Sequence, residues 1–219
     1  MTVPSEPLRL SAVLLAAGAG ARMGHRPKGL IQVDGVALVR RLADALAQVG
    51  VKETVAVLGH HAQAIEPALA GTAVRCMLNP QPDEGQISSV RLGLRSLSEA
   101  SDAVMVLLSD QPLIGPAQLL ALIDAYSQRP VGTEVVQPHV DGLPGNPVVL
   151  SQAVRRQILA QGPEVGCRQW QSAHPDRAYA WHTTDPAYRM DLDTVDDLAA
   201  VRRLAGLAVA WPEHWPGSA

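Results

Sequence analysis

Phenylalanine is absent from this sequence, and the few tryptophans and tyrosines bring the aromatic share to only 3% of 219 residues. The core must therefore be built from leucine, valine, isoleucine and alanine. Residues of the hydrophobic class make up 47% of the chain and charged residues 18%, a balance that predicts a folded chain rather than a disordered one. A chain of this length fits one globular domain or at most two small ones.

Cysteine, excess basic charge and long apolar runs are also scarce. Cys76 and Cys167 lie far apart with no cysteine or histidine in metal-ligand spacing, so neither a zinc site nor a disulfide framework is expected. A net charge of -3 lacks the basic footprint of a nucleic-acid-binding protein. The first apolar run, 10–15, is much shorter than the roughly 20 residues of a membrane span. Residues 1–7 carry Glu6 and no cation, unlike a signal peptide, and we expect a cytoplasmic protein.

Short apolar runs alternate with segments of helical periodicity along the chain. The pattern predicts strands at 10–15, 54–58, 73–78, 103–108, 134–137 and 147–150, and helices from 38, 62, 88, 119, 152, 167 and 194. Such alternation is typical of a three-layer α/β/α sandwich with a Rossmann-like, mostly parallel sheet. We expect one domain over residues 1–207. The tail 208–219 is expected to be loosely held, unless Trp211 and Trp215 pin it to the surface.

A glycine-rich loop follows the first predicted strand. Gly18, Gly20 and Gly24 lie close together, and glycine lets backbone amides approach a ligand. Exposed amides of this kind bind phosphate, and Arg22 and Lys28 add positive charge beside them. A simple strand-to-helix turn is the plainer interpretation. The spacing fits neither a dinucleotide fingerprint, which needs G-x-G-x-x-G, nor a Walker loop, which needs lysine followed by serine or threonine.

Three aspartates are candidates for a magnesium site. Asp110 follows the most continuous apolar run, and the carboxyl end of a strand in an open α/β sheet faces the ligand crevice. Asp191 and Asp193 share one face if their segment is extended. Magnesium prefers oxygen ligands and is commonly held by one or two carboxylates together with substrate phosphates. Thr194 and Asp197, in contrast, are explained as the N-terminal cap of a helix.

Some polar residues require no functional explanation from the sequence. Ser88 or Ser89 would cap the helix that follows it. His60 and His61 follow the second predicted strand and have no carboxylate neighbour in the sequence, so we expect both on the surface.

Six short motifs occur in order along nearly the whole chain. They are LAAGAGARMGHRPK at 15–28, NPQPDEGQISSVRLGL at 79–94, LSDQP at 108–112, GLPGNPVVL at 142–150, GPEVGCR at 162–168 and MDLDTVDDL at 190–198. Each motif is weak alone, but six in order are specific. Together they resemble the MobA-like nucleotidyltransferases of molybdenum-cofactor synthesis. Asn146 departs from the family pattern, in which histidine is more usual at that position.

The resemblance implies a mixed sheet of the nucleotide-diphospho-sugar transferase type and assigns roles to individual residues. Nucleotide binding falls to Leu15, Ala16, Ala17, Gly18, Ala19, Gly20, Arg22, Met23, Gly24, Lys28, Asn79, Gly85, Ser88 and Ser89. Arg22, Lys28 and Asp110 become catalytic residues. The ligands of Mg²⁺, or of Mn²⁺, become Asp110, Asp193 and Asp191. The acceptor contacts become Gln111, Pro112, Gly145, Asn146 and Pro147.

The resemblance also implies a reaction. An acceptor phosphate attacks the α-phosphorus of a nucleoside triphosphate and pyrophosphate leaves; because that phosphate is already ionised near neutral pH, no general base is needed. Ala17 and Gln111 resemble the cytidylyl branch, which implies CTP as donor and a molybdopterin-type acceptor carrying molybdenum.

Three alternatives stay open. They are a GTP-dependent guanylyltransferase, a transferase for another phosphorylated acceptor, and a non-catalytic nucleotide-binding chaperone that inserts the cofactor into a molybdoenzyme apoprotein. Retention of Lys28, Asp110 and Asp193 together argues against the chaperone, because binding alone would not need two metal carboxylates. We expect a monomer or a weak dimer, with neither a nucleic-acid nor a membrane partner.

Overall fold

The structure is a computed structural model and describes residues 8–212. Its strands are β1 (Leu10–Ala16), β2 (Gln32–Val33), β3 (Val36–Ala37), β4 (Glu53–Leu58), β5 (Val74–Leu78), β6 (Ala103–Leu108), β7 (Val135–Val140), β8 (Leu143–Pro144), β9 (Val148–Ser151), β10 (Ala178–His182) and β11 (Val209–Ala210). Its α-helices are α1 (Leu38–Gln48), α2 (Ala62–Ile65), α3 (Gln86–Ser96), α4 (Pro116–Ser127), α5 (Gln152–Ala160), α6 (Cys167–Ala173) and α7 (Val195–Ala205).

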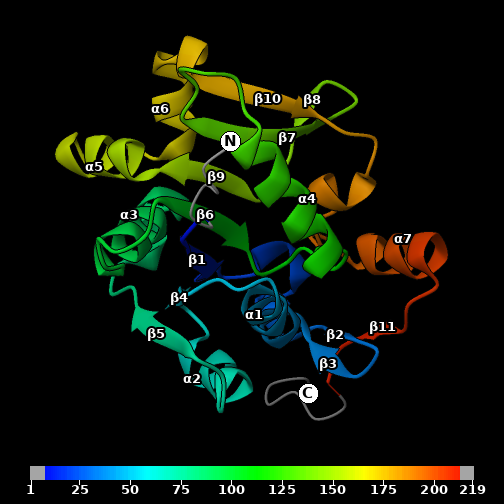
Figure 1. The fold of residues 1–219 in the computed structure, drawn as a ribbon. Helices are drawn as coiled ribbons and strands as arrows, with labels where there is room; N and C mark the ends of the chain where they lie inside the picture. The colour runs from blue at the N-terminus through cyan, green and yellow to red at the C-terminus, as the bar shows by residue number, and fades with distance from the viewer. Residues whose placement is uncertain (1–7, 213–219) are drawn as a thin grey trace.

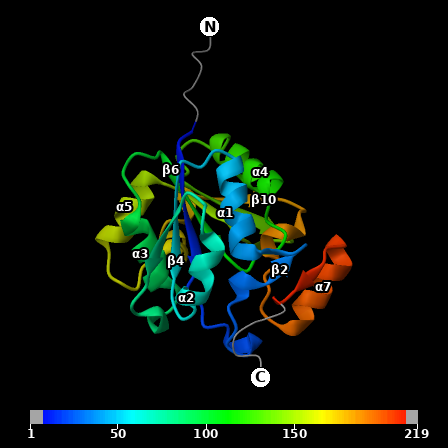
Figure 2. The ribbon, with the colours of Figure 1, turned by 90° about the horizontal axis from the view of Figure 1, so that it is seen from below.

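The main sheet has the order β10-β7-β9-β6-β1-β4-β5, with β8 paired to β7 (Figure 1). β6, β1, β4 and β5 pair in parallel, whereas β9 runs antiparallel between β6 and β7. Helices α3 and α5 lie on one side of the sheet and α1, α2 and α4 on the other, as the view in Figure 2 shows. This mixed, mostly parallel sheet between two helical layers confirms the predicted α/β/α sandwich.

The central strands explain why the sequence folds this way. All residues of β1 are buried, as are all but the last of β6, because helices cover both faces of a parallel sheet and a continuous apolar run satisfies both. Leu14 belongs to the core cluster beneath α1 and α4, and its neighbour Val13 to the cluster beneath α3 and α5. Aliphatic side chains dominate both clusters, as the scarcity of aromatic residues predicted.

The start of α7 follows the predicted chemistry and the start of α3 does not. Thr194 with Asp197 forms the predicted capping box at α7, and Pro116 occupies the first turn of α4. The prediction that Ser88 or Ser89 caps α3 is wrong, because the helix begins two residues earlier with Gly85 as its N-cap. The Ser88 hydroxyl instead donates to the Gly85 carbonyl oxygen at 2.8 Å.

A second, three-stranded sheet was not anticipated. β11 pairs antiparallel with β2, and β2 pairs with β3, so the C-terminal segment lies beside the chain that follows the glycine-rich loop. Val209 is buried in a third apolar cluster that also contains Met23 and Leu192. The Trp211 ring lies under the Arg26 guanidinium at 5.6 Å. Strand pairing and the Trp211 contact thus hold residues 208–212, in line with the alternative that Trp211 pins this segment, while Trp215 lies outside the described residues.

The sequence pattern also missed β10, which extends the main sheet beyond β7. It also missed β2 and β3, which have two residues each. Two residues are too few to show a periodic pattern. Within residues 8–212, every helix is too short or too polar to span a lipid bilayer.

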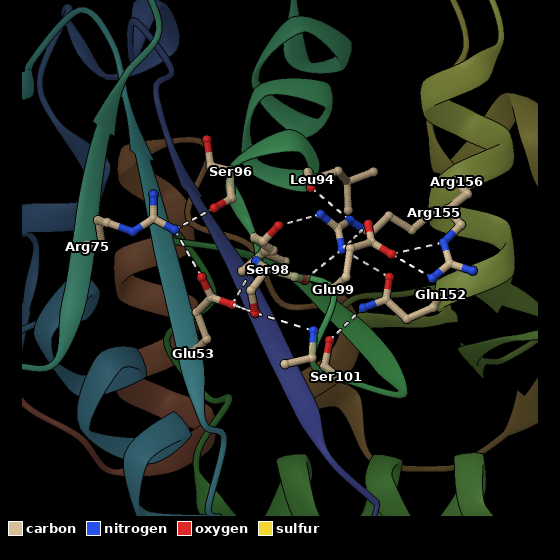
Figure 3. Close-up of polar contacts among 12 residues, drawn as sticks. Glu53, Arg75, Leu94, Ser96, Ser98, Glu99, Ser101, Gln152, Arg155 and Arg156 are labelled. Atoms are coloured by element: carbon tan, nitrogen blue, oxygen red, sulfur yellow. Dashed lines mark hydrogen bonds and ion pairs between the residues drawn. The ribbon is translucent and has the colours of Figure 1, made fainter.

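Arg155 of α5 joins that helix to the C-terminal end of α3 (Figure 3). Its guanidinium is buried and donates to the carbonyl oxygens of Leu94 and Ser98 at 2.8 Å each, and to that of Leu97. These are carbonyls at the end of α3 that have no helical partner, so Arg155 caps the helix from its neighbour.

We expect Arg155→Met to lower the free energy of unfolding by about 2 kcal/mol, because it leaves buried carbonyl oxygens unpaired. Urea denaturation measures the change. Arg156 is the matched control, since its side chain is 65% exposed and pairs with the exposed Glu99. Arg156→Met should cost less than about 1 kcal/mol. Equal losses for the two variants would contradict the capping role.

Candidate nucleotide and metal site

A cavity of about 520 Å³ opens where β1 and β6 end. Gly18, Lys28 and Asp110 all line it, as do Asp191 and Asp193 from the segment before α7. The carboxyl ends of adjacent parallel strands meet at one edge of a sheet, which is why segments so distant in sequence converge here. The predicted crevice is therefore present in the structure.

The glycine-rich loop forms a compact turn. Gly20 and Gly24 have left-handed φ angles of 64° and 69°. A β-carbon on Gly20 would come within 2.0 Å of the Arg26 carbonyl oxygen, so only glycine fits that position. The amides of Met23 and His25 both donate to the Gly20 carbonyl oxygen, at 2.8 and 3.0 Å. Residues 20–25 thus form a compact turn around the short 3-10 helix Ala21–Met23, while the preceding residues 17–19 line the cavity.

Two cations and two carboxylates form one ion network at the cavity. Lys28 Nζ donates to Asp110 and, at 2.7 Å, to one oxygen of Asp193. Arg22 pairs with the other Asp193 oxygen at 2.8 Å. The Lys28 side chain is only 19% exposed, whereas that of Arg22 is 70% exposed. Lys28 therefore lies in the wall of the site, and Arg22 lies at its rim.

The network fixes the charges of its members. Burial disfavours the Lys28 ammonium, but the charges and hydrogen bonds of Asp110 and Asp193 outweigh it and raise the Lys28 pKa above its ordinary value. Burial likewise opposes ionisation of Asp193, yet its bonds with Lys28 and Arg22 lower its pKa. Both groups are therefore ionised at neutral pH.

Asp191 differs from its neighbours. Burial, reinforced by repulsion from Asp110 and Asp193, raises its pKa to about 7. One buried carboxylate oxygen of Asp191 and one of Asp110 have no hydrogen-bond partner within the described residues. A buried acceptor without a partner is costly, so these oxygens are suited to binding a cation.

A divalent metal fits this donor set with help from a ligand. Among residues 8–212, no group of three or more histidine, cysteine or acidic side chains is arranged to hold a metal by itself. Hard cations such as Mg²⁺ need only one or two carboxylates when phosphates and water supply the remaining ligands. The unpartnered oxygens of Asp110 and Asp191 meet that requirement.

The loop before α3 and the start of that helix contribute to the cavity wall. Gly85 and Ser89 line the cavity, whereas Asn79 and Ser88 lie behind it. Asn79 is buried, and its side-chain amide donates at 2.9 Å to the hydroxyls of both Ser88 and Ser89. Asn79 therefore orients the start of α3 rather than reaching the cavity.

A second cavity, of about 460 Å³, adjoins the first and shares Leu15, Gln86 and Leu108 with it. Its polar lining consists of carboxamides and one guanidinium, from Gln86, Gln137, Asn146, Arg168, Gln169 and Gln171. Such a wall offers hydrogen-bond donors and acceptors and one positive charge.

Of the residues predicted to contact an acceptor, Asn146 lines the second cavity and the other four do not. Gln111 is buried and donates at 3.3 Å to the carbonyl oxygens of Asn146 and Tyr188. Gly145, Pro112 and Pro147 are buried as well. These residues shape the backbone that presents Asn146. Gly145 and Pro147 flank it in the sequence, and Gln111 bonds its carbonyl oxygen.

The predicted nucleotide contacts divide in the same way. Those in the cavity wall are Leu15, Ala16, Ala17, Gly18, Ala19, Lys28, Gly85 and Ser89. Gly20, Arg22, Met23, Gly24, Asn79 and Ser88 lie outside the wall. Met23 is buried in the third apolar cluster, where it anchors the loop.

His60 and His61 lie at or near the surface as expected, with His60 exposed and His61 partly buried, but the sequence did not reveal their contacts. His60 lines the cavity and contacts both the Ala17 carbonyl oxygen and the Asp83 carboxylate, at 3.0 and 2.9 Å. His61 contacts the Ala19 carbonyl oxygen at 3.1 Å. No local pattern reveals these contacts, because the partners come from different strands of the sheet.

Comparison with known proteins identifies relatives of most of the chain. A family model described as the MobA-like NTP transferase domain matches residues 12–178. The bifunctional protein GlmU of Sorangium cellulosum (strain So ce56) is 35% identical over 131 residues, and the chain covers 28% of its length. That match covers 57% of the present chain. Nicotine blue oxidoreductase of Paenarthrobacter nicotinovorans is 27% identical over 194 residues, which cover 86% of this chain and 94% of the relative.

Solved structures agree with this assignment. A nucleotidyl transferase from Methanothermobacter thermautotroptrophicus superposes with a TM-score of 0.73 and 25% identity, covering 89% of this chain and 96% of that one. Rv0371C of Mycobacterium tuberculosis H37Rv, solved as a complex with manganese, gives a TM-score of 0.65 and 26% identity. That superposition covers 90% of this chain and all of the other.

Proposed function

Since this chain belongs to the MobA-like NTP transferase domain family, we propose that it transfers CMP from CTP to molybdenum-bound molybdopterin and releases pyrophosphate. The observation that carries the proposal is the convergence of Lys28, Asp110 and Asp193 in one cavity that adjoins a second. A transfer reaction needs a donor and an acceptor held side by side, and two connected cavities provide the two places.

The first cavity is proposed to hold the triphosphate. Residues 17–19 face it with small side chains, so backbone and phosphate can approach closely. Lys28 donates to two carboxylates in the free protein, and an ammonium with three donors can bond a phosphate oxygen in place of one of them. Arg22 at the rim would pair with an outer phosphate.

Asp110 and Asp191, with Asp193 beside them, would hold Mg²⁺ or Mn²⁺ together with the phosphates. The ion supplies charge stabilisation for the α-phosphate and the departing pyrophosphate. The manganese complex of the related Rv0371C supports a divalent ion in this family. The chain's own contribution is to place the carboxylates, because Lys28 and Arg22 fix the Asp193 side chain on both of its oxygens.

The second cavity is proposed to hold the acceptor. Its carboxamides would bond the donors and acceptors of a heterocycle such as a pterin, and Arg168 would pair with the acceptor phosphate. Asn146 takes the place at which the resembled family more often has histidine. Asparagine preserves the ability to donate or accept a hydrogen bond but not to exchange a proton near neutral pH, and the reaction needs no such exchange.

The proposal is tested by measuring pyrophosphate release with each of the four nucleoside triphosphates, with and without the molybdopterin acceptor. Release that depends on both CTP and the acceptor is the expected result. Release with a different phosphorylated acceptor would assign the enzyme to another branch. Nucleotide binding without release under any combination would favour the chaperone alternative.

We expect kcat/KM to be about tenfold higher for CTP than for GTP, because a missing hydrogen bond to the wrong base costs about 1.4 kcal/mol. Ala17 lines the cavity, and we propose that its size limits the space available to a purine. Gln111 is buried outside the cavity, so its influence on base choice would be indirect.

Ala17→Gly is the variant that tests this explanation. Removing the methyl group should raise the GTP/CTP ratio of kcat/KM, whereas Ala64→Gly on α2, outside the cavity, should leave that ratio unchanged. A wild-type enzyme that uses GTP as well as CTP would reverse the choice between the two branches.

A further inference from the structure

The turn that joins β4 to α2 packs directly against the glycine-rich loop. A β-carbon on Gly59 would lie 2.5 Å from the Ala17 carbonyl oxygen and 2.8 Å from the Ala17 β-carbon, so the two backbones are in close contact. His60 and His61 follow Gly59 and bond the loop at Ala17 and Ala19. The position of the loop is therefore fixed from outside as well as by its own turn.

His60 connects this loop to a second segment. Its Nδ1 lies 3.0 Å from the Ala17 carbonyl oxygen, and its Nε2 lies 2.9 Å from an oxygen of Asp83. Asp83 belongs to the short 3-10 turn Pro82–Glu84, which precedes Gly85 and the start of α3. Asp83 and Gly85 line the same cavity as His60. One imidazole thus spans the two segments that form neighbouring walls of the nucleotide cavity.

The two partners of His60 determine its protonation. A carbonyl oxygen and a carboxylate oxygen only accept hydrogen bonds, so both ring nitrogens must carry hydrogen for both contacts to form. A neutral imidazole has a single N–H and can satisfy one partner while its other nitrogen faces an acceptor. The complete bridge therefore exists only with the imidazolium.

We propose that protonated His60 is a positioning residue that holds the glycine-rich loop and the Asp83 turn together, and that this clasp raises affinity for the nucleoside triphosphate. The inference rests on the proposed function in so far as the cavity is the nucleotide site. In the clasped form the imidazolium also adds one positive charge to the wall that faces the phosphates.

The surroundings of His60 are compatible with such a switch. Asp83, whose side chain is 91% exposed, faces it from the 3-10 turn, and Glu84 is the next residue. The neighbouring imidazole of His61 bonds Ala19, and the ion network of Lys28, Asp110, Asp191 and Asp193 lines the same cavity. The hydrogen bond to Ala17 and the contact with Asp83 together raise the pKa of His60.

The direction of the pH effect follows. Because the pKa of His60 is raised by the clasp, the clasp is fully formed below about pH 6.5, the ordinary histidine value, and is lost as the pH rises through the higher value. Nucleotide affinity should decline over the same interval. The pKa of the nucleotide's own phosphate lies lower, near 6, and its ionisation would change affinity in the opposite direction.

The first test uses the protein without nucleotide and so does not depend on the proposed function. NMR titration of ring-labelled histidine should give His60 a pKa above that of a free imidazole. Asp83→Asn should lower it by about half a unit or more. Glu84→Gln is the matched control, since it removes the same charge one residue away, and it should leave the His60 pKa unchanged. A His60 pKa that ignores both substitutions would overturn the clasp.

The second test measures CTP binding and turnover from pH 6 to pH 9. Asp83→Asn should raise the CTP Kd and KM about fivefold at pH 6, as expected for one exposed ion pair, with little change in kcat. At pH 9, where the wild-type clasp is open, the variant and wild type should coincide. His60→Asn, whose amide can still donate to Ala17, should retain more affinity than His60→Ala.

If wild-type affinity is insensitive to pH, the clasp fails while the nucleotide site stands. If wild type binds none of the four triphosphates, the proposed function fails, and the NMR result still judges the clasp.

Discussion

Asp110→Asn should reduce metal-dependent turnover by about 1000-fold, a change of about 4 kcal/mol in the activation free energy. Asparagine preserves the shape of the side chain but removes the negative charge that holds a hard cation. Asp110 bonds Lys28 and has a second, buried oxygen that meets no hydrogen-bond partner among residues 8–212. Loss of the charge therefore removes a metal ligand while Lys28 keeps its contact with Asp193.

The measurements are turnover at saturating Mg²⁺ or Mn²⁺ and CTP binding without metal. CTP binding without metal should be unchanged or stronger. The variant frees Lys28 to bond the phosphates, and it removes the negative charge of Asp110 that repels them. Asp102 flanks the other end of β6 and pairs with Arg9, so Asp102→Asn controls for general effects on the fold. Asp193→Asn should resemble Asp110→Asn, and the double variant should cost little more than the worse single one, because both act through one ion. Full metal-dependent activity in Asp110→Asn would place the metal elsewhere.

Lys28→Ala should lower kcat/KM by about 100-fold, or about 3 kcal/mol. A charge-assisted contact to phosphate is lost, and two carboxylates that share Lys28 are left facing the incoming polyanion. Lys28 is 19% exposed, so the contact is only partly screened by solvent. Both CTP affinity and turnover should decline, since the ammonium would touch phosphate before and during the transfer.

Lys52 provides the control for Lys28. It is exposed at the start of β4, at the end of the strand away from the cavity, and Lys52→Ala should leave the kinetics unchanged. Arg22→Ala should have a smaller effect than Lys28→Ala, because Arg22 is 70% exposed and lies outside the cavity wall. If Lys28→Ala retained wild-type kinetics, Arg22 or another cation would have to hold the phosphates.

The central fold was predictable because its strands carry their own signal. β1 and β6 are continuous apolar runs buried on both faces, and the residues that follow them, the glycine-rich loop and Asp110, must lie at the same edge of the sheet. The strands that were missed carry weaker signals. β10 lies at the edge of the sheet and none of its residues is fully buried. β2 and β11 are held by pairing with each other, although they lie far apart in the sequence.

The site was predictable for residues that follow strands and unpredictable for residues that meet only through the fold. His60 and Asp83 are separated by β5 and two short helical segments, and nothing between them indicates contact. Gln111 illustrates the same limit. The resemblance implied an acceptor contact there, and in the structure its buried amide donates to the backbone carbonyl oxygen of Asn146. Sequence order does not reveal which way a loop side chain points.

The small sheet of β2, β3 and β11 has a consequence for the biogenesis of the protein. The cluster that anchors Met23 of the glycine-rich loop is completed by Leu192 and Val209, and Asp34 bonds Ala208 in both directions. During synthesis the glycine-rich loop leaves the ribosome before Leu192 and Val209 are added, so it must wait for partners that are made much later. A nascent chain stalled before Val209 would thus carry a sheet able to fold and a phosphate loop still without its support.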